Sequence, residues 1–92
     1  MQLGDFIAQL PEAHDGWRRW GASARRAVRG VTPDLRRVGP GMVFVALPSA
    51  RAGATFEAAC TALDRGAEAV VCSLPGLAVP RCVAVPDPQR AL

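Results

Sequence analysis

Apolar residues near the start of the chain recur with the period of a helix. Four of them lie at positions i, i+3, i+4 and i+7: Leu3, Phe6, Ile7 and Leu10. Side chains with this spacing share one helix face, so the pattern predicts a short packing helix. Pro11 follows directly and is expected to end the helix, because proline cannot donate a helical hydrogen bond.

The same period returns in the middle of the chain, at Phe56, Ala59, Cys60 and Leu63. Thr55 comes just before this set and is predicted to be the N-cap, because its hydroxyl can accept a hydrogen bond from the first turn. Gly66 follows the set and is predicted to stop the helix, since glycine readily takes the left-handed conformation that ends many helices.

Four short apolar segments predict strands: Val28–Val31, Met42–Leu47, Ala69–Cys72 and Cys82–Val85. The second is apolar without alternation, which is typical of a strand buried on both faces of a parallel sheet. Strand, helix and strand between Met42 and Cys72 form one βαβ unit, whose crossover should be right-handed. The sequence therefore predicts an α/β fold, a small mostly parallel sheet flanked by helices, in a single domain spanning residues 1–92.

Residues 12–29 allow two interpretations. Trp17 and Trp20 lie among five arginines: Arg18, Arg19, Arg25, Arg26 and Arg29. Arginines contact phosphates and indole rings stack on bases, which would make residues 17–29 a nucleic-acid-binding module. The alternative, which we favour, is a solvated connector whose tryptophans cover the edge of the core. His14 has no cysteine or second histidine nearby, so no metal site is predicted.

Composition narrows the classes of partner. The net charge of +3 is mild and does not by itself imply a nucleic-acid or membrane partner. No segment approaches the roughly 20 apolar residues that cross a bilayer. The three cysteines form no CxxC pair, and an odd number of cysteines without a signal peptide is typical of a reducing compartment. We therefore expect a cytoplasmic protein in which Cys60 and Cys72 act as small apolar residues.

The last residues predict the start of another helix. Asp87 followed by Pro88 is typical of an N-cap and first helical residue. Only about one turn follows, and one turn is not stable alone because helix nucleation is costly. We expect residues 88–92 to begin a helix that leads into a further domain of a longer polypeptide.

A series of motifs then runs in order along the chain: Asp34-Leu35-Arg36, Pro40-Gly41-Met42-Val43-Phe44-Val45-Ala46, a loop with Gly53, Gly66-Ala67, and Val83-Ala84-Val85-Pro86-Asp87. In its order and spacing the series resembles the N-terminal domain of the Mur ligases of bacterial peptidoglycan synthesis. The start and length of the chain are closer to the MurE type than to the MurF type.

The resemblance implies a binding role. In this family the domain binds the UDP end of a UDP-N-acetylmuramoyl-peptide. ATP and Mg are bound by a central domain that this chain lacks, and a third domain brings the incoming amino acid. The implied contacts to the uridine diphosphate come from Pro33, Leu35, Ala50, Arg51 and Ala52. The supporting loop positions are Asp34, Arg36, Ser49 and Gly53.

The residue types explain part of these roles. Small residues let backbone N–H groups approach a diphosphate closely, which suits the loop at residues 50–52. Arg51 would pair with phosphate oxygens, or else remain a solvated loop charge. Asp34 and Arg36 lie two residues apart in a turn, where short polar side chains commonly orient the backbone rather than touch a ligand.

Several positions depart from the family pattern. Leu35 lies where the family has serine, so a side-chain hydrogen bond of typically about 1 kcal/mol is lost. Met42 replaces an aspartate, Ser49 replaces a glycine, and an Asp-Gly-His loop is reduced to a single glycine. Two further interpretations therefore stay open: a MurF-type domain, and a divergent non-catalytic module of the same fold.

Catalysis is not expected from this chain alone. It contains no lysine and hence no G-x-x-x-x-G-K-[ST] phosphate loop. Its single histidine does not complete a Ser/His/Asp or Cys/His set. We expect a domain of an ATP-dependent amide ligase with no catalytic residue, no metal site and no cofactor of its own. Its expected partners are the UDP-N-acetylmuramoyl-peptide substrate and the remaining ligase domains.

Overall fold

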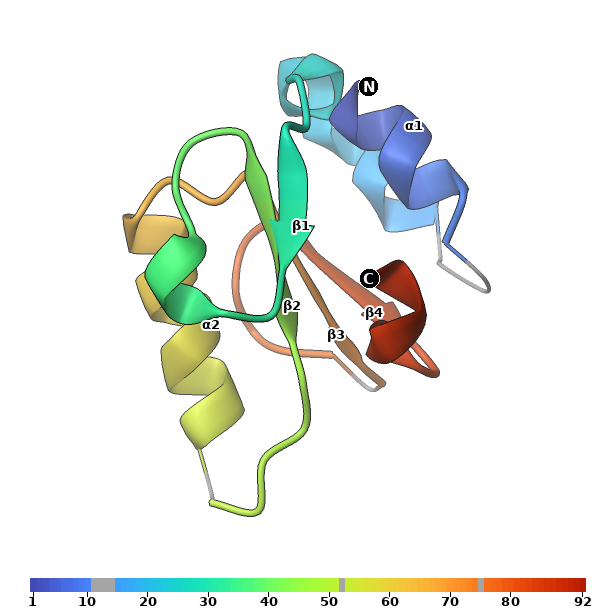
Figure 1. Cartoon of the computed structure of the whole chain (residues 1–92). Helices are drawn as coiled ribbons and strands as arrows, with labels where there is room; N and C mark the ends of the chain where they lie inside the picture. The colour runs from blue at the N-terminus through green and yellow to red at the C-terminus, as the bar shows by residue number, and fades with distance from the viewer. Residues whose placement is uncertain (11–14, 52, 75) are drawn as a thin grey trace.

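A four-stranded sheet forms the centre of the molecule (Figure 1). The computed structural model describes residues 1–10, 15–51, 53–74 and 76–92. Within them the strands are β1 (Gly30–Thr32), β2 (Met42–Ala46), β3 (Ala69–Ser73) and β4 (Cys82–Val85). They lie side by side in chain order, and each is parallel to its neighbour. All carboxyl ends of the strands therefore meet at one edge of the sheet.

Helical segments cover both faces of the sheet. The described elements are α1 (Leu3–Ala8), α2 (Ala54–Asp64) and three 3₁₀ segments, η1 (Asp15–Arg25), η2 (Leu35–Arg37) and η3 (Pro88–Ala91). Figure 1 shows α1 and the C-terminal turn on one side of the sheet and α2 on the other. The predicted α/β fold with a sheet flanked by helices is confirmed, and the described sheet is wholly parallel.

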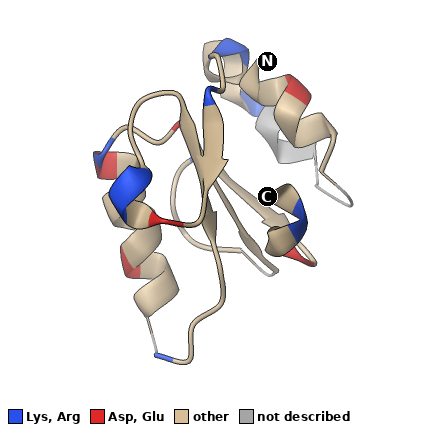
Figure 2. Ribbon diagram, in the orientation of Figure 1, with Lys and Arg blue, Asp and Glu red and all other residues tan. Residues whose placement is uncertain are grey.

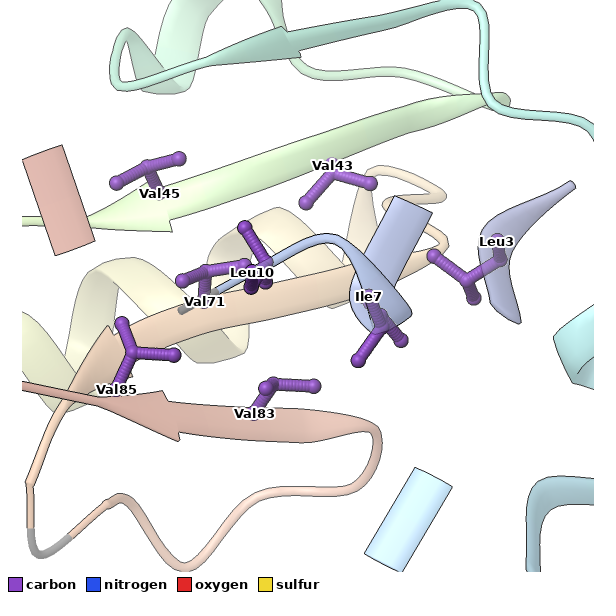
Figure 3. Packing of buried hydrophobic residues seen from close by; sticks show 9 residues of the cluster. Leu3, Ile7, Leu10, Val43, Val45, Val71, Val83 and Val85 are labelled. Atoms are coloured by element: carbon purple, nitrogen blue, oxygen red, sulfur yellow. The ribbon is translucent and has the colours of Figure 1, made fainter. Parts of the chain in front are cut away.

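The uninterrupted apolar run of β2 follows from this two-sided cover. Successive strand residues point to opposite faces. Val43 and Val45 pack with Leu3 and Ile7 of α1 in a first core cluster (Figure 3). Phe44 and Ala46 point to the other face. They pack in a second core cluster with the buried alanines of α2. Both faces of the strand are thus removed from water, so no polar position is needed.

The strand boundaries agree closely with the sequence pattern, except at β1. The predicted strand Cys82–Val85 is observed with the same ends, and β2 and β3 differ from prediction by one residue each. The first strand runs over Gly30–Thr32 rather than Val28–Val31. The backbone around Val28 pairs with the N-terminus instead, through the Val28 N–H to the Met1 carbonyl at 2.7 Å.

The ends of α2 show one correct prediction and one error. Gly66 has φ of 101° and follows the helix, as predicted. Its N–H and that of Ala67 donate to carbonyls of the last turn, each at 3.0 Å, which closes the helix in a Schellman motif. Thr55 is not the N-cap: Gly53 occupies that position, and the Thr55 hydroxyl donates to the Leu47 carbonyl at 3.3 Å. The loop geometry, and not the hydroxyl, sets where α2 begins.

The connector between α1 and β1 contains the 3₁₀ segment η1. Gly21 has φ of 60° and ψ of −126°, which interrupts η1. Trp20 is half-buried against the first core cluster, as expected for a residue that covers the core edge. Pro11, His14 and the side chain of Trp17 lie outside the described part of the chain.

A buried carboxylate organises the amino edge of the sheet. Glu68 accepts the Gly41 N–H at 3.1 Å and pairs with Arg26 at 3.2 Å. Its backbone N–H donates to the Met42 carbonyl at 2.8 Å, and its carbonyl accepts from Nε of Arg81 at 2.9 Å. One residue therefore joins the connector and the turn before β2 to the starts of β2, β3 and β4.

We expect Glu68→Ala to lower the free energy of unfolding by about 1–3 kcal/mol, because the buried Gly41 N–H loses its acceptor. Urea unfolding checks this. The control is Glu57→Ala, which removes an exposed ion pair with Arg51 and should cost less than about 1 kcal/mol. Equal losses for the two variants would contradict the role given to Glu68.

We expect Gly66→Ala to lower stability by about 1–2 kcal/mol, since a side chain is strained at this φ. The added Cβ would also lie 3.1 Å from Cγ of Pro40. Gly39→Ala is the matched control, because a Cβ there meets no atom within 4 Å. Thermal unfolding compares the two, and a Gly66→Ala protein as stable as the control would count against this account.

Candidate functional site

A cavity of about 270 Å³ lies at the carboxyl ends of β1 and β2. Pro33 and Leu35 border it from the turn after β1, and Ser49 borders it from the loop after β2. Thr55 in the first turn of α2 closes a third side. Ligands of open α/β sheets bind outside the carboxyl ends of the strands, so this cavity is the candidate site.

The turn after β1 is held by its own polar side chains. The Asp34 carboxylate accepts the Arg36 backbone N–H at 3.0 Å and so caps η2. It also pairs with the Arg36 guanidinium at 3.2 Å and with Arg37 at 3.7 Å. These hydrogen bonds from Arg36 lower the pKa of the Asp34 carboxyl below its usual value. The Asp34 side chain thus orients the turn backbone, whereas the Arg36 guanidinium contacts the Asp34 carboxylate.

Leu35 is fixed from two sides. Its side chain packs partly buried against the second core cluster. Its carbonyl accepts a hydrogen bond from the guanidinium of Arg65, just beyond α2, at 3.0 Å. The turn after β1 is therefore tied to the far end of α2, which keeps Leu35 at the cavity wall.

In the loop after β2, some residues border the cavity and others lie on the exposed surface. The Ser49 hydroxyl accepts the Arg51 N–H at 3.2 Å. The Arg51 guanidinium pairs with Glu57 at 3.0 Å, and both side chains are largely exposed. Ala50 is exposed and, like Arg51, is absent from the described cavity lining. Ala52 lies outside the described residues, and Gly53 takes φ of 78° to start α2.

The structure therefore brings together three of the sequence-predicted residues, namely Pro33, Leu35 and Ser49. Sequence reasoning missed the apolar floor of the cavity, which Phe44 and Ala46 supply from β2. The alternation along β2 could have indicated it, because these two residues share the face opposite to that of the neighbouring valines.

The residues around the cavity limit the chemistry that it can offer a ligand. Its walls are largely apolar, and the first turn of α2 borders it with the positive end of the helix dipole. The Thr55 hydroxyl is engaged with the Leu47 carbonyl. Over the described ranges, no group of three or more His, Cys, Asp or Glu side chains could hold a metal ion. Shape and backbone groups are what this site can offer a ligand.

Two of the five arginines that could form a nucleic-acid surface make contacts within the protein. Arg26 pairs with buried Glu68, and the aliphatic stem of Arg29 covers Gly41, where an added Cβ would lie 2.6 Å from Cδ of Arg29. Figure 2 shows basic residues spread over η1, η2, the loop before α2 and η3. None of the helices in the described part of the chain has the length and apolar character needed to cross a membrane.

We compared the chain with family models and with known proteins. No family model matches it, but several known proteins are similar. It is 46% identical over 97 residues to a UDP-N-acetylmuramoyl-L-alanyl-D-glutamate--2,6-diaminopimelate ligase of Mesorhizobium japonicum, with all of this chain and 18% of the relative covered. The ligase of the same name from Chlorobaculum tepidum is 40% identical over 95 residues, covering 99% of this chain and 18% of that protein.

A second type of relative also matches. The UDP-N-acetylmuramoyl-tripeptide--D-alanyl-D-alanine ligase of Mycobacterium leprae is 44% identical over 68 residues, which cover 74% of this chain and 13% of the relative. The chain thus spans less than one fifth of the length of the curated relatives it matches.

Comparison of the fold with solved structures also finds a Mur ligase. The solved structure of a UDP-N-acetylmuramoyl-L-alanyl-D-glutamate--2,6-diaminopimelate ligase superposes with a TM-score of 0.69 at 27% identity, covering 94% of this chain and 16% of the other. Sequence and fold agree over nearly the whole chain, and the chain is therefore a domain of the Mur ligase family, similar to part of the MurE ligases.

Proposed function

We propose that the chain is the N-terminal, substrate-binding domain of a MurE-type ligase. In this proposal it binds the uridine diphosphate end of UDP-N-acetylmuramoyl-L-alanyl-D-glutamate. The observation that carries the proposal is the cavity of about 270 Å³ at the carboxyl ends of β1 and β2. Three residues that the family resemblance implicates border it: Pro33, Leu35 and Ser49.

The size and lining of the cavity fit part of a nucleotide. Small-molecule sites usually enclose about 300–1,000 Å³, so this cavity suits the nucleoside end while the sugar and peptide extend outward. Apolar contacts from Pro33, Leu35 and Phe44 would cover the base and ribose. The diphosphate would meet the first turn of α2, where backbone N–H groups and the helix dipole favour anions.

In this proposal Arg51 joins the site when a ligand arrives. Its guanidinium is held by Glu57 on the surface, at 3.0 Å, with 69% of the Arg51 side chain exposed. An exposed ion pair of this kind is worth under about 1 kcal/mol, so exchanging Glu57 for a diphosphate oxygen costs little. Ala50 and Ala52 would contribute backbone N–H groups from the same loop.

The rest of the reaction belongs to other domains in this proposal. ATP and Mg would be bound by a central domain, and the amino acid would be brought by a third, because this chain has neither lysine nor a phosphate loop. The cytoplasmic location remains a prediction that follows from the cysteines, which are free in the structure.

The proposal predicts a localised response to substrate. Titrating UDP-N-acetylmuramoyl-L-alanyl-D-glutamate into ¹⁵N-labelled protein should shift the amide resonances of residues 33–36 and 49–55. UDP alone should shift the same set, since the nucleotide end carries the contacts. Shifts confined to other segments, or none at millimolar ligand, would overturn the assignment of the site.

A gain of affinity gives a sharper form of the same test. Leu35→Ser restores a hydroxyl at the cavity wall, and one added hydrogen bond of about 1 kcal/mol tightens the dissociation constant about fivefold. Leu74→Ser is the matched control, because Leu74 is 58% exposed and is not among the cavity residues. Thermal unfolding confirms that both variants are folded, and equal affinities for UDP would contradict the placement of Leu35.

A MurF-type domain is the second candidate, supported by the similarity to the Mycobacterium leprae ligase. The names of the two kinds of relative specify substrates that share UDP-N-acetylmuramoyl and differ in peptide length. If the cavity holds only the nucleotide end, the dipeptide and tripeptide substrates should bind with equal affinity. Calorimetric titration of both compares them, and a clear preference for the tripeptide would favour the MurF type.

A further inference from the structure

Two cysteines face each other across the neighbouring strands β3 and β4. Cys72 lies near the end of β3 and Cys82 begins β4. The strand register pairs Cys82 with Val70 and Cys72 with Ala84, so the cysteines are diagonal neighbours. Their sulfur atoms are 2.8 Å apart. Both side chains contribute to the second core cluster, on the α2 side of the sheet.

The surroundings of the two sulfurs differ. Cys72 is buried, with 1% of its surface exposed, whereas Cys82 is partly exposed. The segment that connects β3 to β4 returns over this face, where Leu77 and Val79 pack against the cluster. The pKa of Cys82 is lowered to about 7, because the hydrogen bonds from the Cys72 thiol and from the Leu77 backbone N–H together outweigh the opposite effect of burial.

A partly exposed cysteine with thiolate character beside a buried thiol is the arrangement of a peroxidatic and a resolving cysteine. A disulfide requires an S–S separation of about 2.05 Å. From 2.8 Å the sulfurs need to approach by less than about 1 Å to form the bond. The third cysteine, Cys60, lies on α2 and has no sulfur partner among the described residues.

We propose that Cys72 and Cys82 are a redox-active pair, which hydrogen peroxide converts into a reversible disulfide between β3 and β4. The Cys82 sulfur attacks one peroxide oxygen, the O–O bond breaks, and the departing oxygen leaves as water with the Cys82 proton. Cys82 is then a sulfenic acid. The Cys72 sulfur attacks it, the S–O bond breaks, and the hydroxyl leaves as water with the Cys72 proton.

The electrons balance in this sequence, because the two thiols lose two electrons and the peroxide gains two. A dithiol reductant reverses the change by thiol–disulfide exchange. The product joins the edge strand β4 covalently to β3 and encloses residues 72–82 in a ring. Oxidation should therefore make it harder for the outer strand β4 to separate from β3. This inference does not depend on the proposed binding of UDP.

Peptide mapping tests the proposal directly on the full chain. The protein is treated with hydrogen peroxide, its remaining thiols are alkylated after denaturation, and it is cleaved after arginine. Cys72 then lies in residues 66–81, Cys82 in residues 82–90 and Cys60 in residues 52–65. We expect residues 66–81 and 82–90 to be linked, with the link lost on treatment with dithiothreitol.

Variants separate the pair from chance oxidation. Cys60→Ser should form the link as the unaltered chain does, whereas Cys72→Ser should leave Cys82 oxidised to sulfenic or sulfinic acid without a link. The unaltered chain should unfold at a higher temperature when it is oxidised than when it is reduced. This comparison does not depend on whether any variant folds. A link that includes Cys60, or no link in the folded unaltered chain, would overturn the proposal.

Discussion

The whole structure depends on burying both faces of the central strands β2 and β3. Each of these strands has a sheet neighbour on either side, so its backbone groups are paired within the sheet. Their side chains, by contrast, require apolar cover above and below. α1 supplies it through Leu3 and Ile7 on one face, and α2 supplies it through its alanines on the other. The small side chains of α2 let that helix lie close to Phe44.

The amino and carboxyl edges of the sheet differ in their contacts. At the amino edge, buried Glu68 joins the turn before β2 to the connector through Gly41 and Arg26. At the carboxyl edge, the chain leaves β1 and β2 in short loops that do not close over the sheet. The cavity lies there because α2 begins beyond the end of β2 rather than directly on it.

The polar side chains around the cavity are largely engaged within the protein. Asp34 and Arg36 use their charges on each other and on the turn backbone. Thr55 uses its hydroxyl on the Leu47 carbonyl. The groups left to face a ligand are apolar side chains, backbone N–H groups and the start of α2. Leu35 fits this pattern, since its side chain belongs partly to the core.

Much of the fold could be predicted from the sequence because the determining signals are local. The uninterrupted apolar run at Met42–Ala46 indicates a strand covered on both faces, and Gly66 marks the end of α2 through its own backbone freedom. The family resemblance had also implicated Pro33, Leu35 and Ser49, and these three residues border the cavity at the carboxyl ends of the strands.

Other features were decided only when distant segments met. The first strand is displaced because Val28 pairs with Met1. Gly53 rather than Thr55 is the N-cap of α2, and the Thr55 hydroxyl donates to the Leu47 carbonyl instead. The 2.8 Å approach of Cys72 and Cys82 depends on the register of two neighbouring strands. By itself the sequence determined the periodic elements and their order, since these follow from each residue and its near neighbours. The tertiary structure decided which polar groups and sulfur atoms are partners, because a hydrogen bond or a thiol pair requires a separation of about 3 Å that no local pattern specifies.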